Sequence, residues 1–144
     1  MKKIILIFLL IFLMGCSNKI ESSQQFKDCF SEARMNEIQT MKLIETFSLE
    51  KIELSVKNVC ILRYAQMEKD KSACSRIDVD KLRAYYDSLS EEQKQSELGG
   101  VIIVNGFSAR DSCYNNLAVE LKDTSLCEKI EQETLKNNCI SYSR

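Results

Sequence analysis

CILRYAQMEKDKSACSRI (Cys60–Ile77) aligns without a gap with CYNNLAVELKDTSLCEKI (Cys113–Ile130). The two copies share both cysteines, an alanine, a Lys-Asp pair, a serine and the final isoleucine. The short stretch KNNCI at 136–140 echoes KNVCI at 57–61, and its cysteine lies 26 residues after Cys113, about half of the 53-residue shift between the copies. We therefore predict repeats at residues 57–78 and 110–131, a partial copy at 136–144, and a degraded unit between the two good copies.

Each repeat is expected to form a helix, a tight turn and a second helix, with one cysteine on each arm. The shared alanine lets two helices approach closely, and the shared Lys-Asp ends the first helix so that the Asp or the following Ser caps the next. Ser125 and Glu128 also have the spacing of a capping box. Periods of this kind indicate stacked helical hairpins, so the predicted fold class is all-α, a small disulfide-stapled bundle or a short stack of hairpins.

The rest of the chain also has helical patterns. Ser48 is placed to cap a long helix, a further helix is expected from Asp78 or Asp80 to about Leu89, and Ser90–Gln93 has the capping-box pattern. The long helix carries an apolar stripe of Leu49, Ile52, Val56, Val59, Cys60, Tyr64 and Met67. Val101–Val104 resembles a strand, but no second strand would pair with it, so we interpret it as a buried helix.

The N-terminus has the parts of an export signal: Lys2 and Lys3, an apolar run from Ile4 to Met14, and small residues after it. The run is shorter than the roughly 20 residues of a membrane-spanning helix. Leu13-Met14-Gly15-Cys16 resembles the lipobox of bacterial lipoprotein precursors. The resemblance implies that residues 1–15 are removed as a signal peptide and that Cys16 becomes the acylated N-terminus, anchored in the membrane by lipid. A plain secretory signal with an unmodified cysteine is the alternative.

This resemblance sets the expected domain organisation. Residues 16–25 are predicted to be a polar tether, and residues 26–144 a helical, Cys-rich domain. Ser17 resembles the default outer-membrane sorting state, so the expected location is the extracytoplasmic cell envelope, at the periplasmic face of the outer membrane where the cell has one. The hairpin repeats resemble those of uncharacterised exported proteins, and that resemblance carries no activity.

The remaining cysteines, Cys29, Cys60, Cys74, Cys113, Cys127 and Cys139, are even in number. In an exported chain without a C-x-x-C motif, three structural disulfides are the expected use. Pairing like with like predicts Cys60–Cys74, Cys113–Cys127 and Cys29–Cys139. Within a hairpin the two cysteines would differ by about five residues of helical rise, roughly 7.5 Å, which is close to the limit for bridged Cα atoms. Cys127–Cys139 therefore remains open as a rival pair.

Composition excludes several classes of function. The chain has no His, which removes Ser-His-Asp and Cys-His catalysis and histidine-bound metals. The mature chain would have a net charge of −3 (18 − 21), with no basic patch to recommend nucleic acid. We expect a non-catalytic, membrane-anchored binding or structural module, without cofactor or metal, that binds or inhibits another envelope protein. The alternative is an exported enzyme that uses a free thiol or the carboxylates of Glu91–Glu92 or of Glu131 and Glu133, although such acids typically lie on solvated helix faces.

Overall fold

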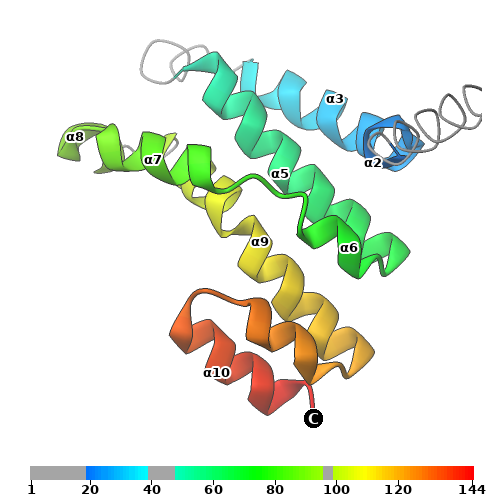
Figure 1. Ribbon diagram of the computed structural model, residues 1–144. Coiled ribbons are helices and arrows are strands. Elements are labelled where there is room, and N and C mark those ends of the chain that lie inside the picture. Colours follow the sequence, from blue (N-terminus) through cyan, green and yellow to red (C-terminus); the bar gives the residue numbers. More distant parts are fainter. Residues whose placement is uncertain (1–18, 39–47, 96–98) are drawn as a thin grey trace, which may run out of the picture.

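The computed structural model describes residues 19–38, 48–95 and 99–144, and these contain helices and turns but no β-strand (Figure 1). The helices are α2 (Lys19–Ser22), α3 (Gln24–Ile38), α5 (Leu49–Glu68), α6 (Lys71–Cys74), α7 (Asp80–Ser88), α8 (Glu91–Gln95), α9 (Gly99–Leu121), the 3₁₀ helix η1 (Thr124–Lys129) and α10 (Glu133–Tyr142). The predicted all-α, disulfide-stapled fold is confirmed. None of the described helices has the length and apolar character needed to cross a bilayer. The predicted signal peptide and Cys16 lie outside the described residues.

The two good copies of the repeat fold alike. The first copy spans the end of α5, a tight turn and α6, and the second spans the end of α9, a tight turn and η1. Lys69 and Lys122 end the long helices in the left-handed conformation, with φ of 53° and 51°. In both copies the amide of the following aspartate donates to the carbonyl of the shared alanine at 2.9 Å, a helix ending that uses the left-handed residue.

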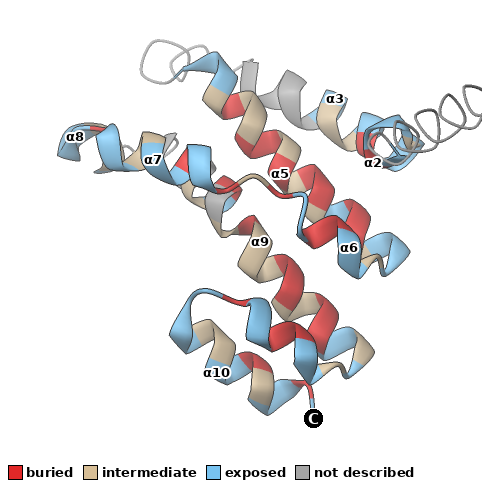
Figure 2. Ribbon diagram, in the orientation of Figure 1, coloured by how far each residue is buried: buried red, intermediate tan, exposed pale blue. Residues whose placement is uncertain are grey.

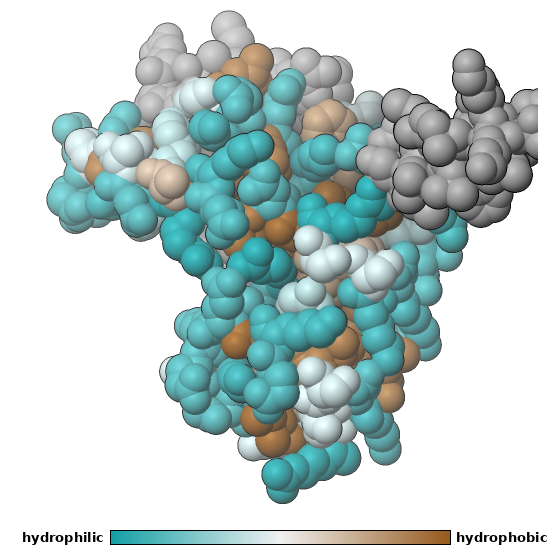
Figure 3. Space-filling model, in the orientation of Figure 1, coloured by the Kyte–Doolittle hydropathy of each residue, from teal (hydrophilic) through white to brown (hydrophobic). Residues whose placement is uncertain are grey.

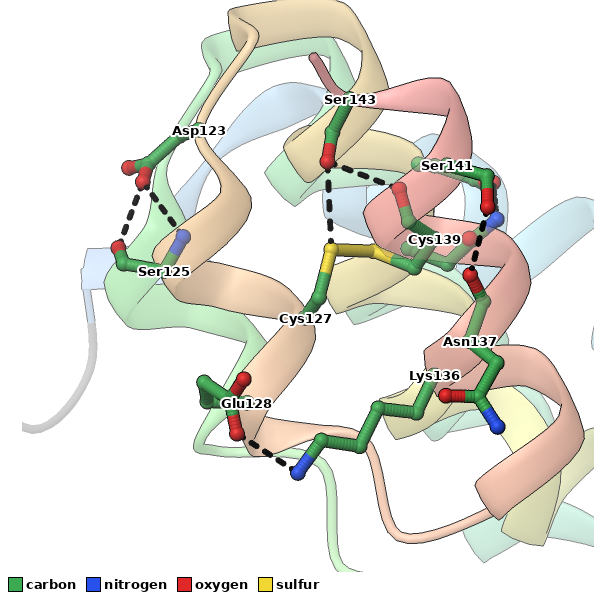
Figure 4. The surroundings of a disulfide bond; sticks show 11 residues. Asp123, Ser125, Cys127, Glu128, Lys136, Asn137, Cys139, Ser141 and Ser143 are labelled. Atoms are coloured by element: carbon green, nitrogen blue, oxygen red, sulfur yellow. Dashed lines mark hydrogen bonds and ion pairs between the residues drawn. A yellow bond between two sulfur atoms is a disulfide. The ribbon is translucent and has the colours of Figure 1, made fainter.

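The shared aspartate of each turn caps the next helix. The Asp70 carboxylate accepts from the Ser72 amide at 2.9 Å, and the Asp123 carboxylate accepts from the Ser125 amide at 3.1 Å. The expected capping box of Ser125 with Glu128 is wrong, because the Ser125 hydroxyl donates to Asp123 at 2.6 Å instead (Figure 4). Of the two residues proposed as the cap, the aspartate therefore caps the helix in both copies.

The long helices α5 and α9 lie against each other at the centre of the fold (Figure 1). The middle of the predicted α5 stripe is buried except for Val59, which is half-buried. Its ends at Leu49 and Met67 are 41% and 66% exposed (Figure 2). Ser55 and Asn58 lie outside the stripe and are 1% exposed. An apolar pattern could not reveal these two, because they pack on α9 through small size and hydrogen bonds rather than through hydrophobic surface.

Gly106 of α9 lies close against α5. A Cβ atom added there would lie 2.3 Å from the Ser55 Oγ and 2.7 Å from both the Ser55 Cα and the Leu82 Cδ1. The Asn58 amide donates to the Gly106 carbonyl at 3.0 Å. Val101–Val104 is helical, as predicted, because it belongs to α9; Val104 is half-buried, and the side chains of 101–103 lie outside the described part of the structure.

All six predicted cysteines form disulfides, but none of the three predicted pairs is found. The bridges are Cys29–Cys60, Cys74–Cys113 and Cys127–Cys139, with Cα–Cα distances of 5.6–5.7 Å. The predicted pairs Cys60–Cys74, Cys113–Cys127 and Cys29–Cys139 are therefore wrong, and the rival Cys127–Cys139 is confirmed.

The length of the second arm explains the difference. Cys60 lies eight residues before the end of α5 at Glu68, a rise of about 12 Å, whereas α6 contains only four residues and returns about 6 Å. Cys74 therefore falls short of Cys60 and reaches Cys113 on the next long helix. Each second-arm cysteine bridges forward to the next unit, and the disulfides join consecutive units instead of closing each hairpin.

The predicted tether is shorter than expected. Residues 19–22 form α2, and Ile20 is only 3% exposed. The Ser23 hydroxyl oxygen accepts from the Phe26 amide at 3.2 Å, which caps α3. The prediction of a tether over residues 16–25 is therefore wrong for residues 19–25, because the single apolar Ile20 anchors this polar stretch to the core.

Candidate binding cleft

A cleft of about 500 Å³ opens between α7, α9 and the start of α10. Figure 3 shows the surface hollowed between the arm formed by α7 and α8 and the part of the molecule that carries α10. Its lining residues are Arg83, Val104, Ser108, Asp111, Ser112, Glu131, Gln132 and Leu135. Four of these lie at positions 104, 108, 111 and 112 of α9, which is the spacing of one helix face.

Glu131 sits in the cleft between two arginines. Its carboxylate accepts from Arg83 at 3.0 Å and also from Arg110. The hydrogen bond from Arg83, with the positive charge of both guanidinium groups, holds the pKa of Glu131 below its ordinary value. Glu131 is therefore an ionised partner in a charge cluster, and a lowered pKa is the opposite of what a general acid requires.

Asp111 fixes the wall of the cleft at the start of α10. Its two carboxylate oxygens accept from the backbone amides of Glu131 at 3.2 Å and Gln132 at 3.0 Å. Asn58 has the same role in the first copy, where its side chain accepts from the Asp78 amide at 3.2 Å and donates to the Asp78 carbonyl at 2.7 Å. Asn58 and Asp111 align in the repeat, as do Asp78 and Glu131, so the clamp is a repeated feature.

The cleft offers hydroxyls, an amide, a charge cluster and two apolar side chains, Val104 and Leu135. Ser108 and Ser112 have no histidine to activate them, since the chain contains none. The set is suited to packing and hydrogen bonding with another polypeptide.

The acids proposed for an enzyme, Glu91, Glu92, Glu131 and Glu133, are all exposed. Glu91 forms an ion pair with Lys94 at 3.0 Å at the surface of α8. Glu131 is held by the arginines, and Glu133 is exposed in the first turn of α10. Within residues 19–38, 48–95 and 99–144, every cysteine is in a disulfide, and no group of His, Cys, Asp and Glu is placed to hold a metal ion.

No local sequence pattern indicates this cleft, because Arg83 and Arg110 lie 48 and 21 residues before Glu131. The one signal that bears on it is the repeat, which aligns Asp111 with Asn58 at a position where both side chains can accept from backbone amides. Comparison of the chain with protein-family models, with characterised proteins and with solved structures finds no match.

Proposed function

We propose that the chain is an exported lipoprotein, anchored through Cys16, whose helical domain is a non-catalytic module that binds another envelope protein. The observation that carries the proposal is the set of disulfides between consecutive repeat units. Structural disulfides persist in oxidising compartments outside the cytoplasm, which is where the lipobox of residues 13–16 would deliver the chain. Helical repeats commonly offer a surface for protein partners, and the cleft on α9 is the candidate surface here.

The short tether also indicates how the domain would be oriented on the membrane. Only residues 17 and 18 separate Cys16 from α2, so the Cα atoms of Cys16 and Lys19 lie at most about 11 Å apart. A domain of this size has a radius of gyration of about 14 Å. A tether shorter than the domain radius would hold the α2 side against the membrane. The cleft is lined by residues of α7, α9 and the start of α10, and in Figure 1 α7 and α10 lie on the opposite side of the molecule from α2. In this arrangement the cleft is available to a partner.

The anchoring is tested by intact-mass analysis of protein extracted from membranes. We expect loss of residues 1–15, a gain of acyl mass on Cys16, and no reactive thiol under denaturing conditions, whereas Cys16→Ala should leave the precursor uncleaved. A mature wild-type chain without lipid, or with two or more free thiols, would contradict the proposal.

Partner binding is tested with a photo-crosslinking amino acid at Gln132, which lines the cleft immediately before α10, and at Asn138, an exposed control position within α10. We expect Gln132 to crosslink one envelope protein and Asn138 to crosslink none. Equal products from both positions would argue against the cleft as the binding site.

A further inference from the structure

The cleft lies at a position of the second repeat unit whose equivalent in the first unit is covered by α9. Ser55, on α5, aligns with Ser108, on α9, at the 53-residue shift of the repeat. Ser55 is 1% exposed because Gly106 packs directly on it. Ser108 is partly exposed and lines the cleft. The same small residue is therefore under a helix in one unit and open in the other.

The neighbours of the two serines correspond as well. Gly106 contacts three residues of the first unit: its carbonyl accepts from Asn58, and a Cβ at Gly106 would meet Ser55 and Leu82. The aligned residues of the second unit are Asp111, Ser108 and Leu135, and all three line the cleft. The first unit uses three positions to contact the backbone of α9. The second unit has the same three positions, but there they line the open cleft.

The length of α10 explains why this space is open. α9 is bridged to the first unit by Cys113 and continues for 14 residues before that cysteine, back to Gly99, which carries it past Ser55. α10 is bridged to the second unit by Cys139 but begins only six residues before it, at Glu133. α10 aligns with α7 in the repeat but carries the bridge that α9 carries in the first unit. It begins beside Asp111, so the face of α9 around Ser108 stays uncovered.

We infer that the cleft is a docking site for an α-helix of the partner, which packs across Ser108 as α9 packs across Ser55. This inference rests on the proposed binding function and names the form of the partner. The partner helix should carry Gly, or at most the next smallest residues Ala and Ser, where it crosses Ser108, because the equivalent close contact in the first unit is made by a glycine.

Asp111 adds a second requirement. Asn58 donates a hydrogen bond to the Gly106 carbonyl, whereas a carboxylate has no hydrogen to donate. Asp111 already accepts from two backbone amides and keeps further acceptor capacity. The partner helix should therefore place a donor, such as a Ser or Thr hydroxyl or a Lys ammonium, beside its small residue.

The test is a selection of displayed helical peptides of about 20 residues on the intact, disulfide-bonded protein. Enriched peptides should share an apolar stripe interrupted by Gly, Ala or Ser, with a donor side chain nearby. Ser108→Trp should weaken their binding about ten- to a hundredfold, the effect of overpacking a close contact. Val119→Trp, at an exposed position of the same helix, should leave binding unchanged, and both variants are first checked for an unchanged melting midpoint. Ser112→Trp replaces Ser108→Trp if the latter does not fold.

The outcomes separate this inference from the proposed function. Peptides that bind Ser108→Trp as tightly as the wild type, or that lack a small residue in the stripe, would overturn helix docking at this site, as would a selection that enriches no peptide. Lipid on Cys16 and a Gln132 crosslink to an envelope protein, found together with such a result, would leave the binding function standing and remove only the helical form of the partner.

Discussion

The close contact of Gly106 with α5 predicts that Gly106→Ala destabilises the protein. In an exposed helix interior, Gly→Ala stabilises by about 1 kcal/mol because alanine has the higher helix propensity. At Gly106 the new methyl group would lie 2.3 Å from the Ser55 Oγ and 2.7 Å from the Ser55 Cα. Carbon atoms in good contact are about 3.5–4.0 Å apart. The serine hydroxyl could rotate away, but the Cα is backbone, so α5 and α9 must separate.

The size of the effect follows from these opposing contributions. Overpacking typically costs about 1–3 kcal/mol and sometimes more, and separation of the helices would also stretch the 3.0 Å hydrogen bond from Asn58 to the Gly106 carbonyl. With the gain in propensity subtracted, we expect a net loss of about 1–2 kcal/mol. For a domain of this size, that corresponds to a fall of about 4–8 °C in the melting midpoint.

The measurement is chemical and thermal unfolding of the oxidised protein followed by circular dichroism. Asn105→Ala is the matched control, because the neighbouring Asn105 is exposed and should gain a few tenths of a kcal/mol from propensity alone. Ser55→Gly combined with Gly106→Ala should lose less stability than the sum of the single changes, since the hydroxyl clash disappears. An increase in stability for Gly106→Ala that matches or exceeds the Asn105→Ala control would refute the reasoning.

Three further predictions concern the Cys74–Cys113 disulfide, the ion pair of Lys71 with Asp123, and the hydrogen bonds of Asn58. Cys74→Ser and Cys113→Ser should each lower stability by about 4 kcal/mol, the chain-entropy value for a bridge across 39 residues, and together should lower it no further; additive losses in urea unfolding would mean that the two cysteines are not joined. The hydrogen bond from Lys71 is the largest cause that lowers the pKa of Asp123 to about 2, so the stability contributed by this carboxylate is present above its ordinary pKa of 3.8 and is lost as the pH falls through about 2. Lys71→Ala should therefore raise the pKa of Asp123 toward 3.8 in an NMR titration of the carboxyl carbon, and an unchanged pKa would exclude the ion pair. Asn58→Leu should cost about 2–4 kcal/mol, because it leaves buried backbone groups without partners, and a loss under 1 kcal/mol in urea unfolding would show that water or other groups replace the amide.

Features with local causes could be predicted from the sequence. The Ser90–Gln93 capping box is confirmed, since the Gln93 side chain accepts from the Ser90 amide at 3.0 Å and the Ser90 hydroxyl accepts from the Gln93 amide at 3.3 Å. The turns after α5 and α9 and the helix from Asp80 also lie where their patterns indicated. In each case the deciding atoms are within a few residues of one another, so the pattern contains the whole cause.

The disulfide partners could not be predicted from the repeat. The repeat shows that Cys60 and Cys113 have equivalent surroundings, and so do Cys74 and Cys127. This equivalence is satisfied equally by bridges within each hairpin and by bridges from one unit to the next. What decides is the number of residues in α6, because a four-residue helix does not return far enough to reach Cys60. Sequence patterns locate helix ends only to within about 2–4 residues, and the shortfall of about 6 Å corresponds to about four residues of helical rise.

The position of the cleft and the length of the tether depend on individual residues, and no sequence pattern distinguishes these residues from their neighbours. Ile20 is one apolar residue among polar neighbours, yet its burial moves the start of the domain from Phe26 to Lys19. Arg83 and Arg110 are two charges among many on helix faces, and Glu131 lies in the connection between η1 and α10. Only the packing of α7, α9 and this connection brings the three into contact. Charges on solvated faces are the common case, so their convergence had to come from the tertiary structure.

The unequal ends of the repeat connect fold to function. A stack of helical units leaves the last unit with a face that the next would have covered, and proteins commonly protect such a face with a capping element. Here α10 takes the bridge to Cys127 and packs on η1, but it begins at Glu133 and leaves Ser108 uncovered. α10 therefore covers only the part of the last interface around its disulfide and η1. The part around Ser108 stays open, and the equivalent part of the first unit contacts the backbone of α9. A partner helix at this site would complete the stack with the contacts that the chain already uses for itself.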